Sequence, residues 1–286
     1  MKLQRWILSI VGSLLLSFSL VAPAAGTLDK IKTEKLISLG YRESSIPYSY
    51  VGDDNQPWGY SVDLCIKVVA ALVKQLGLDE LPLQWLPVTP ETRVAMLKSG
   101  QIDIECGATT STLSRMNDVD FSLPIFVDGG GYLVRRASGI RRFDDLAGKR
   151  VAVIAGTTTE RAIVDALGRQ KIGFELLRVS DHQQGIGALL KGKADAYAAD
   201  RSQLIGLALD SGNQSDWSLG QETFSYEPLA LMVRRNDASF RLAVNRELAR
   251  LSRTREIHAI YNRWFGFLSP PGPLLENLYF LNGLPE

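Results

Sequence analysis

Hydroxyl-bearing side chains are concentrated in two short segments of the sequence, each next to a charged residue. The segment 107–115, GATTSTLSR, follows a short predicted strand and is predicted to open a helix, which would place Arg115 in the first turn. A helix macrodipole disfavours a cation there, so an anion shared by the guanidinium and free backbone N–H groups explains the arrangement better. The segment 156–160, GTTTE, repeats the pattern. Either turn alone is usually a simple helix cap, but the pair indicates a binding site for an anionic group.

Side chains typical of catalytic or metal sites are scarce. The two histidines are His182 and His258, which excludes a site built from several histidines. The signatures of α/β-hydrolases, zinc proteases and P-loop enzymes are missing. The glycines at 129–131 lack the following helix that a phosphate cradle needs, and we interpret them as a hinge. The sequence therefore predicts ligand binding without catalysis, metal or cofactor.

The composition is that of a globular protein. The 286 residues are 45% hydrophobic and 22% charged, and this length is sufficient for two domains with cores of their own. With 32 basic and 31 acidic residues, the net charge of +1 gives no indication of nucleic-acid binding. Two cysteines are too few for a disulfide-dense scaffold or a four-thiolate zinc site.

The N-terminus has the features of a secretory signal peptide. Lys2 and Arg5 precede an uncharged apolar run over 6–21, and the small residues Ala22-Pro-Ala24 follow it. A membrane anchor is the alternative, but this run of 16 residues is shorter than the ~20 that a bilayer requires. We therefore predict a signal peptide over residues 1–25 and an exported mature protein in an oxidising compartment.

Short strand patterns alternate with helical patterns, which predicts an α/β fold with two sets of βα units. The predicted strands are 36–41, 83–88, 102–105, 150–155, 174–179 and 194–199. The predicted helices are 61–77, with Ser61 as N-cap, 90–99, 158–170 and 183–191.

Two apolar segments that end in a basic pair, 131–136 and 229–235, look like crossings between two lobes. We predict a discontinuous lobe 1 over 27–133 plus 230–268 and a lobe 2 over 134–229, joined by a hinge at the base of a cleft. Two domains in series are the alternative, but the piece after the second crossing is too short to fold alone. The tail, 269–286, is rich in proline at its start, which favours an extended path.

The two cysteines are predicted to form a disulfide. Cys65 falls in the first predicted helix and Cys106 ends a strand of the same lobe. Two buried free thiols are the alternative.

Several motifs resemble periplasmic solute-binding proteins for polar amino acids. The segment 106–126 contains Cys106, Gly107, Thr110 and Arg115, followed by DFSLP at 120–124. The segments GYRESSIPYSY at 40–50, GYSVDL at 59–64 and ECGATT at 105–110 narrow the resemblance to the glutamate/aspartate-binding branch. The resemblance covers about residues 27–266 and implies a type II periplasmic-binding-protein fold, with two hinged lobes that each contain a mostly parallel sheet flanked by helices.

The resemblance also implies a set of ligand-binding residues. Arg115 would pair with the α-carboxylate of an amino acid, with help from Thr110 and Thr158, and Asp200 would bind the α-ammonium. Arg42, Arg93 and His182 would surround the side-chain carboxylate of the ligand. The full set is Arg42, Arg93, Ala108, Thr110, Arg115, Thr158, His182 and Asp200. Three arginines and one aspartate complement the charges of an acidic amino acid. Alternatively, Arg42 forms an exposed ion pair with Glu43 and His182 is a loop residue.

Two residues depart from the family pattern. Pro90 and Ala108 stand where the family usually has serine, so two ligand hydrogen bonds are lost unless Thr89 or Thr109 replaces them. We therefore expect an amino-acid ligand, with an acidic side chain favoured.

The resulting expectation is a monomeric periplasmic receptor that delivers glutamate or aspartate to the permease of an ABC importer. One alternative is a receptor for another polar amino acid. A second is an exported dehydratase of the cyclohexadienyl or arogenate type on the same scaffold, which needs a general acid in the cleft. The candidates for that acid are Asp200, His182, Glu105 and Glu160.

Overall fold

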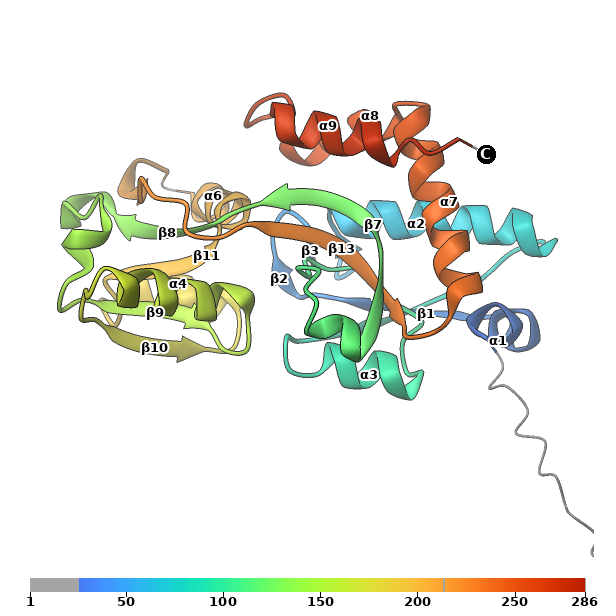
Figure 1. Ribbon diagram of the computed structural model, residues 1–286, viewed down its shortest axis with the longest axis horizontal. Helices are drawn as coiled ribbons and strands as arrows, with labels where there is room; N and C mark the ends of the chain where they lie inside the picture. Colours follow the sequence, from blue (N-terminus) through green and yellow to red (C-terminus); the bar gives the residue numbers. More distant parts are fainter. Residues whose placement is uncertain (1–25, 213, 286) are drawn as a thin grey trace, which may run out of the picture.

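The computed structural model describes residues 26–212 and 214–285, which fold into two lobes (Figure 1). The predicted signal peptide lies outside the described residues. Within the described ranges, none of the helices has the length and hydrophobicity of a transmembrane span.

Lobe 1 is built around a five-stranded sheet. Its order is β5 (Leu83–Pro87), β1 (Ile37–Tyr41), β6 (Ile104–Glu105), β13 (Glu227–Arg234) and β7 (Val119–Asp128). Four strands run in one direction and β13 opposes them. The helices of this lobe are α1 (Thr27–Glu34), α2 (Tyr60–Leu76), α3 (Arg93–Ser99), α7 (Ala238–Arg253), α8 (Glu256–Phe265) and α9 (Pro273–Asn282). Apolar residues of α2, α7 and α8 form the larger core, while α3 covers a smaller cluster that contains Val119 and Met232.

Lobe 2 repeats this plan with a second sheet. Its order is β10 (Glu175–Val179), β9 (Arg150–Ile154), β11 (Ala196–Asp200), β8 (Gly130–Arg135) and β12 (Trp217–Leu219), and only β8 opposes the rest. Side chains alternate between the two faces, as strand geometry requires. Ala196 and Ala198 pack with α4 (Thr158–Arg169), whereas Tyr197 and Ala199 pack with α5 (His182–Leu190) and α6 (Arg201–Asp210). The expected α/β class with two mostly parallel sheets is confirmed.

Short elements complete the described chain. A small sheet is formed by β2 (Ser44–Ser45), β3 (Ser49–Val51) and β4 (Pro57–Trp58). Single 3-10 turns lie at η1 (Arg115–Asn117), η2 (Arg136–Ser138), η3 (Phe143–Leu146) and η4 (Gln214–Asp216).

The chain changes sheet slightly earlier than the sequence predicts. Figure 1 shows β7 and β13, which pair with each other, extending from lobe 1 toward lobe 2. The first crossing lies at Gly129, so 130–133, assigned to lobe 1 from the sequence, belongs to β8 of the second sheet. The second crossing precedes Glu227, so 227–229 belongs to the first sheet. The apolar runs lie within one sheet each, and the crossings fall in the more polar residues before them.

Three local expectations are wrong. The first is the cap of α2, which begins at Tyr60 with Gly59 as N-cap, while the hydroxyl of Ser61 is buried without a hydrogen-bond partner. The second is the helix expected at 90–99, because α3 begins only at Arg93. The third is the extended tail: its prolines end at the first position of a helix, α9, where proline is well tolerated.

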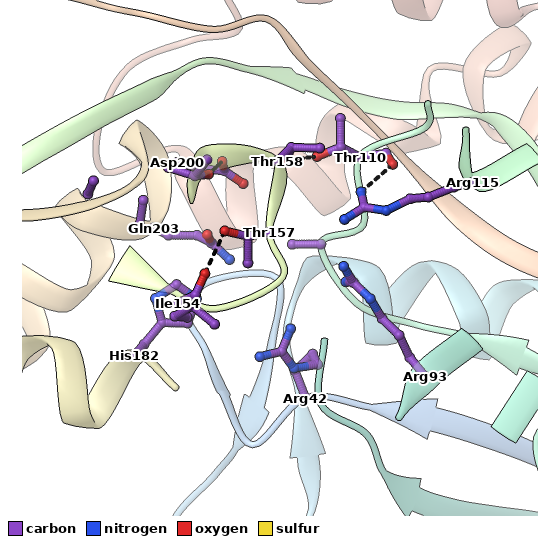
Figure 2. Close-up of a pocket in the computed structure, with 14 residues that line it drawn as sticks. Arg42, Arg93, Thr110, Arg115, Ile154, Thr157, Thr158, His182, Asp200 and Gln203 are labelled. Carbon is purple, nitrogen blue, oxygen red and sulfur yellow. Dashed lines mark hydrogen bonds between the residues drawn. The ribbon is translucent and has the colours of Figure 1, made fainter. Parts of the chain in front are cut away.

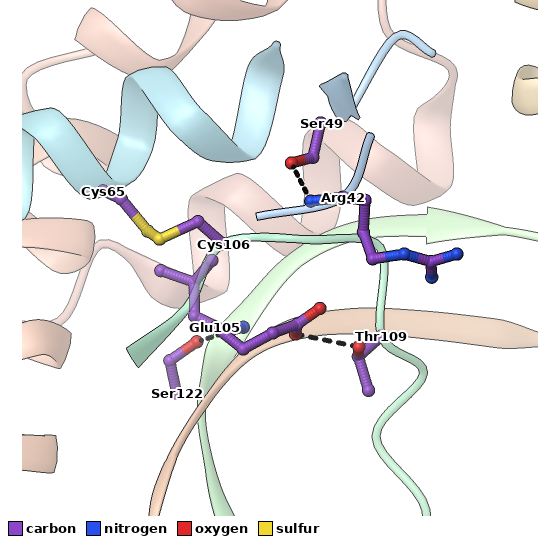
Figure 3. The surroundings of a disulfide bond; sticks show 8 residues. Arg42, Ser49, Cys65, Glu105, Cys106, Thr109 and Ser122 are labelled. Carbon is purple, nitrogen blue, oxygen red and sulfur yellow. Dashed lines mark hydrogen bonds between the residues drawn. A yellow bond between two sulfur atoms is a disulfide. The ribbon is translucent and has the colours of Figure 1, made fainter. Parts of the chain in front are cut away.

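The predicted disulfide is confirmed. Cys65 of α2 and Cys106, which follows β6, are bonded and fully buried, with Cα atoms 6.2 Å apart (Figure 3). The bond fastens α2 to the strand that leads into the segment 107–115.

Candidate functional site

A polar cavity lies between the lobes and contains all eight predicted ligand-binding residues (Figure 2). Its volume is about 430 Å³, part of which is open to solvent. Lobe 1 contributes residues that follow β1 and β6 or begin α3, and lobe 2 contributes the ends of β9 and β11 and the starts of α4, α5 and α6. Such positions at the carboxyl ends of strands are the usual place for ligands in open α/β sheets. The lining residues are Arg42, Arg93, Ala108, Thr110, Arg115, Ile154, Thr157, Thr158, Thr159, His182, Ala198, Ala199, Asp200 and Gln203.

Three guanidinium groups occupy the lobe 1 side of this cavity. Arg42 and Arg93 are 6% and 4% exposed, and Arg115 is partly buried. Burial and the neighbouring Arg93 lower the pKa of Arg42 to about 10. Burial, together with Arg93 and Arg161, also lowers the pKa of Arg115 to about 10. These depressed values mean that the charges are incompletely balanced within the protein, so an anion is favoured here.

The partners of these arginines differ. Arg115 donates from Nη1 to the carbonyl oxygen of Thr110, 2.7 Å away. Arg93 donates to the hydroxyl of Thr109, which in turn donates to the carboxylate of Glu105. The Nε of Arg93 is buried and has no hydrogen-bond partner among the described residues. The side chain of Arg42 forms no hydrogen bond or ion pair with another described residue, so the exposed pair with Glu43 is not present.

A carboxyl group lies on the opposite, lobe 2 side. Asp200 ends β11 and is 6% exposed, and its closest hydrogen bond comes from the hydroxyl of Thr159 at 3.4 Å. Burial raises the pKa of Asp200 well above its ordinary value, and the nearby carboxylates of Asp128 and Glu227 raise it further. A cation next to Asp200 would relieve this unfavourable charge.

The imidazole of His182 is neutral and adds no further positive charge to the cavity. His182 is the first residue of α5, after the N-cap Asp181, and is 3% exposed, so it is not a loop residue. Burial, with the adjacent charge of Arg42, lowers its pKa to about 3. Its Nδ1 lies 2.7 Å from the hydroxyl of Tyr197, which has no other hydrogen-bond partner among the described residues. We assign the hydroxyl as the donor to Nδ1, an arrangement that satisfies its proton and places the imidazole proton on Nε2.

The two hydroxyl-rich turns differ from each other. The segment 156–160 is a true helix start, because the Thr157 side chain caps the N–H of Glu160 at the beginning of α4. The segment 107–115 does not open an α-helix, since only the 3-10 turn η1 forms there. Arg115 is thus held by a loop that hydrogen-bonds along the start of β13, through Ser111 N to Pro228 O at 2.8 Å. Both turns nevertheless reach the same cavity.

The substituted positions are not compensated by their neighbours. Ala108 lines the cavity, whereas Pro90, Thr89 and Thr109 do not. The hydroxyl of Thr89 bonds the turn before α3, and that of Thr109 lies between Arg93 and Glu105. Six further residues line the cavity. Thr157 and Thr159 belong to the predicted anion-binding segment 156–160, whereas the sequence did not single out Ile154, Ala198, Ala199 or Gln203. Gln203, three residues after Asp200 and in the first turn of α6, could have been found from that spacing.

Comparison with known proteins gives a consistent result. Residues 37–267 match the family described as bacterial extracellular solute-binding proteins, family 3. The chain is 38% identical over 270 residues to an L-glutamate/L-aspartate-binding protein of Pseudomonas aeruginosa, covering 94% of this chain and 89% of that protein. It is 32% identical over 257 residues to a glutamate/aspartate import solute-binding protein of Escherichia coli, covering 90% and 85% of the two chains.

Solved structures show the same fold. An ancestral arginine-binding protein bound to arginine aligns with a TM-score of 0.71 at 25% identity, over 81% of this chain and 99% of that one. A substrate-binding protein of an ABC uptake transporter from Streptococcus pneumoniae, bound to histidine, aligns with a TM-score of 0.75 at 20% identity, over 85% and 98%.

Proposed function

Because the chain belongs to the bacterial extracellular solute-binding proteins of family 3, we propose that it is a monomeric periplasmic receptor that captures L-glutamate or L-aspartate for the permease of an ABC importer. The observation that carries this proposal is the charge distribution in the cavity, with Arg42, Arg93 and Arg115 on one side and Asp200 on the other. The named functions of the relatives in Pseudomonas aeruginosa and Escherichia coli support it.

The α-amino-acid end of the ligand is assigned to Arg115 and Asp200. The guanidinium of Arg115 pairs with the α-carboxylate, to which the free N–H groups at the start of α4 also donate. Asp200 pairs with the α-ammonium, which restores its ionised form. These two residues suffice for the part that all amino acids share.

The side-chain end is assigned to Arg42, Arg93 and His182. They would remain without an anionic partner if the ligand were neutral, and desolvating unpaired donors is costly. A ligand with a second carboxylate satisfies the two guanidinium groups and the Nε2 proton of His182. Neutral amino acids are therefore rejected.

The dehydratase alternative has less support. Of the four candidate acids, only Asp200 and His182 line the cavity. Burial and Arg42 hold the pKa of His182 near 3, so it carries no acidic proton at neutral pH. The side chain of Glu160 bonds Arg178 and the N–H of Gly156 at the start of α4, and Glu105 is buried behind Thr109. Of the four candidates, this leaves Asp200, with its raised pKa, as the general acid. The same carboxyl group can equally well bind the ammonium group of an amino acid.

Titration calorimetry with the twenty L-amino acids tests the proposal. We expect tight binding of L-glutamate and L-aspartate, with glutamine and asparagine weaker by about 100-fold or more. Binding of glutamine or a basic amino acid as tightly as glutamate would contradict the acidic-ligand assignment. The same preparation incubated with prephenate and arogenate tests the enzyme alternative, since a dehydrated product would favour it.

A further inference from the structure

Glu227 is a buried carboxylate that the resemblance does not assign to the site. It is the first residue of β13, directly after the second crossing between the lobes, and is 1% exposed. Unlike Asp103 or Glu247, it forms no salt bridge with a described residue. Its charge acts on Arg115, but the two side chains form no ion pair, so a carboxylate kept in such a place needs another explanation.

Three hydroxyl groups from three parts of the molecule donate to Glu227. Its Oε2 accepts from Thr110 of lobe 1 at 2.6 Å and from Thr158 of lobe 2 at 2.8 Å. Its Oε1 accepts from Ser225 of the crossing segment at 2.6 Å. Thr110 and Thr158 line the cavity, and Figure 2 shows them next to each other, between Asp200 and Arg115.

These hydrogen bonds determine what the two threonines can offer a ligand. An ionised carboxylate only accepts, and each hydroxyl has a single proton. Both protons are used within this cluster, whether each hydroxyl donates to Glu227 or one hydroxyl donates to the other across 3.1 Å. The two Oγ1 atoms therefore have only lone pairs left for a ligand. They are suited to receive a hydrogen bond from a cationic donor and unsuited to donate to a carboxylate.

The surrounding charges favour a cation at the same place. Glu227 and Asp128 both raise the pKa of Asp200, while Arg115 lowers it. Three carboxyl groups therefore face one guanidinium in this part of the cavity, which leaves an excess of negative charge. An ammonium group has three N–H donors, and Asp200, Thr110 and Thr158 supply three acceptors.

We infer that Glu227 is a positioning residue for ammonium recognition, which acts through Thr110 and Thr158 by orienting both hydroxyls as acceptors. This inference rests on the proposed function, because it concerns the same cavity. It departs from the roles implied by the resemblance, which pairs the two threonines with the α-carboxylate. The α-carboxylate then depends on the Arg115 guanidinium and backbone N–H groups.

The test compares L-glutamate with glutarate, which lacks only the ammonium group. In Glu227→Gln the side chain keeps its shape but loses its charge, and its amide NH₂ can reverse the threonine hydrogen bonds. By calorimetry on the full mature protein, we expect the substitution to weaken L-glutamate by roughly 10- to 100-fold and glutarate by less than about 3-fold. An equal loss for both ligands would mean that Glu227 merely supports the fold, and would overturn the inference.

A matched control is Glu105→Gln, which removes another buried carboxylate that accepts from a threonine but lies against Arg93. It is expected to change the affinities for the two ligands by a similar factor. Thermal unfolding of each variant shows whether the protein is folded.

A second measurement needs no glutarate binding. In a double Thr110→Val, Thr158→Val background, Glu227→Gln should cost less than about 3-fold in L-glutamate affinity, because its intermediaries are gone. The same loss as in wild type would overturn the inference. If wild type prefers a different amino acid, that amino acid and its deaminated analogue replace L-glutamate and glutarate in these measurements. The acidic-ligand proposal can then be wrong while the inference about Glu227 is still tested. A wild-type protein that binds no amino acid would overturn both.

Discussion

Single residues of the cavity carry charges that the protein leaves unbalanced. Arg42 has no ion-pair partner among the described residues, and Asp200 lies near two other carboxylates. A buried charge without a partner costs folding free energy. On the proposed function a ligand pairs with these charges, so substitutions there should separate binding from stability.

Replacing an arginine of the side-chain end should remove the discrimination between glutamate and glutamine. We expect Arg42→Ala or Arg93→Ala to weaken glutamate binding by about 2–5 kcal/mol, because each strands a buried carboxylate of the ligand. Glutamine should lose much less. Calorimetry with both ligands measures the difference.

The matched control for this experiment is Arg246→Ala, an exposed arginine on α7. It should leave both affinities unchanged. Arg42→Ala is the cleaner of the two site variants, since Arg93→Ala also deprives Thr109 and Glu105 of their partner. If glutamate and glutamine weaken equally in Arg42→Ala, that residue does not contact a second carboxylate.

Asp200→Asn should abolish amino-acid binding yet stabilise the ligand-free protein. The pKa of Asp200 is raised by burial and then by Asp128 and Glu227, so its ionised form opposes folding. The destabilisation is absent below the unfolded-state pKa, develops as pH rises toward the folded-state pKa, and is complete above it. A neutral amide should therefore raise stability at neutral pH by roughly 1–2 kcal/mol, or a few degrees in Tm.

Thermal unfolding of wild type and Asp200→Asn across pH measures this effect. The gain should disappear in acid, where Asp200 is protonated in both the folded and the unfolded state. A variant that is less stable than wild type at neutral pH would show that the carboxylate makes favourable contacts we have not identified.

The candidate site could be predicted residue by residue only where a motif contained the residue. All eight predicted residues line one cavity. Most of them follow a strand or begin a helix, where ligands are usually bound in α/β sheets, whereas Arg115 is held by a loop. Glu227 could not be found in this way. Its carboxylate follows a crossing segment without periodic pattern, and its three hydroxyl partners are brought to it only by the packing of both lobes.

Among the elements, α9 shows where sequence reasoning about proline fails. Three prolines at 270–273 suggested an extended chain, but the last of them occupies the first turn of a helix. Packing of its buried face stabilises this helix. Leu275 joins the main core, and the Tyr279 hydroxyl lies 2.9 Å from that of Tyr60. Tertiary burial thus determines the structure of this segment.

Shortening one buried side chain of α9 should destabilise lobe 1. Tyr279 is 1% exposed and Phe280 is 82% exposed, although they are adjacent. We expect Tyr279→Ala to cost about 3–5 kcal/mol in the free energy of unfolding, as for other buried aromatic residues. Phe280→Ala should cost less than about 0.5 kcal/mol. Similar losses in urea unfolding for both variants would mean that α9 does not pack as described.

The disulfide links two elements at a sequence separation of 41 residues. In the chain-entropy model, closing a loop of this length stabilises the folded state by roughly 3–4 kcal/mol. The unfolding midpoint in urea should fall accordingly after reduction or in Cys65→Ala, Cys106→Ala. Thiol titration of the unreduced, denatured protein should find no free thiol, and two free thiols would refute the pairing.

At the scale of the whole molecule, alternating strand and helix patterns were sufficient to predict two α/β lobes and a return to the first. The exact crossing points were not predictable. Gly129 and the residues before Glu227 lack the apolar periodicity of a strand, and the paired strands β7 and β13 become recognisable as crossings only through their register. That register places Glu227 opposite Asp128, at the level where the two sheets separate.

Hydrogen bonds connect the two lobes around the cavity. The Thr110 and Thr158 hydroxyls meet across the cavity, and nearer the crossing the Tyr48 hydroxyl lies 2.8 Å from that of Ser202. Because Arg115 and Asp200 come from different lobes, one amino acid satisfies both only when the cleft is shut. We therefore expect the ligand-free protein to sample more open forms and saturating L-glutamate to favour the closed one. Small-angle scattering should show a smaller radius of gyration with ligand for wild type and no change for Asp200→Asn. Measurable binding to wild type with an unchanged scattering curve would contradict the hinge, because a rigid cleft would then admit the ligand without closing.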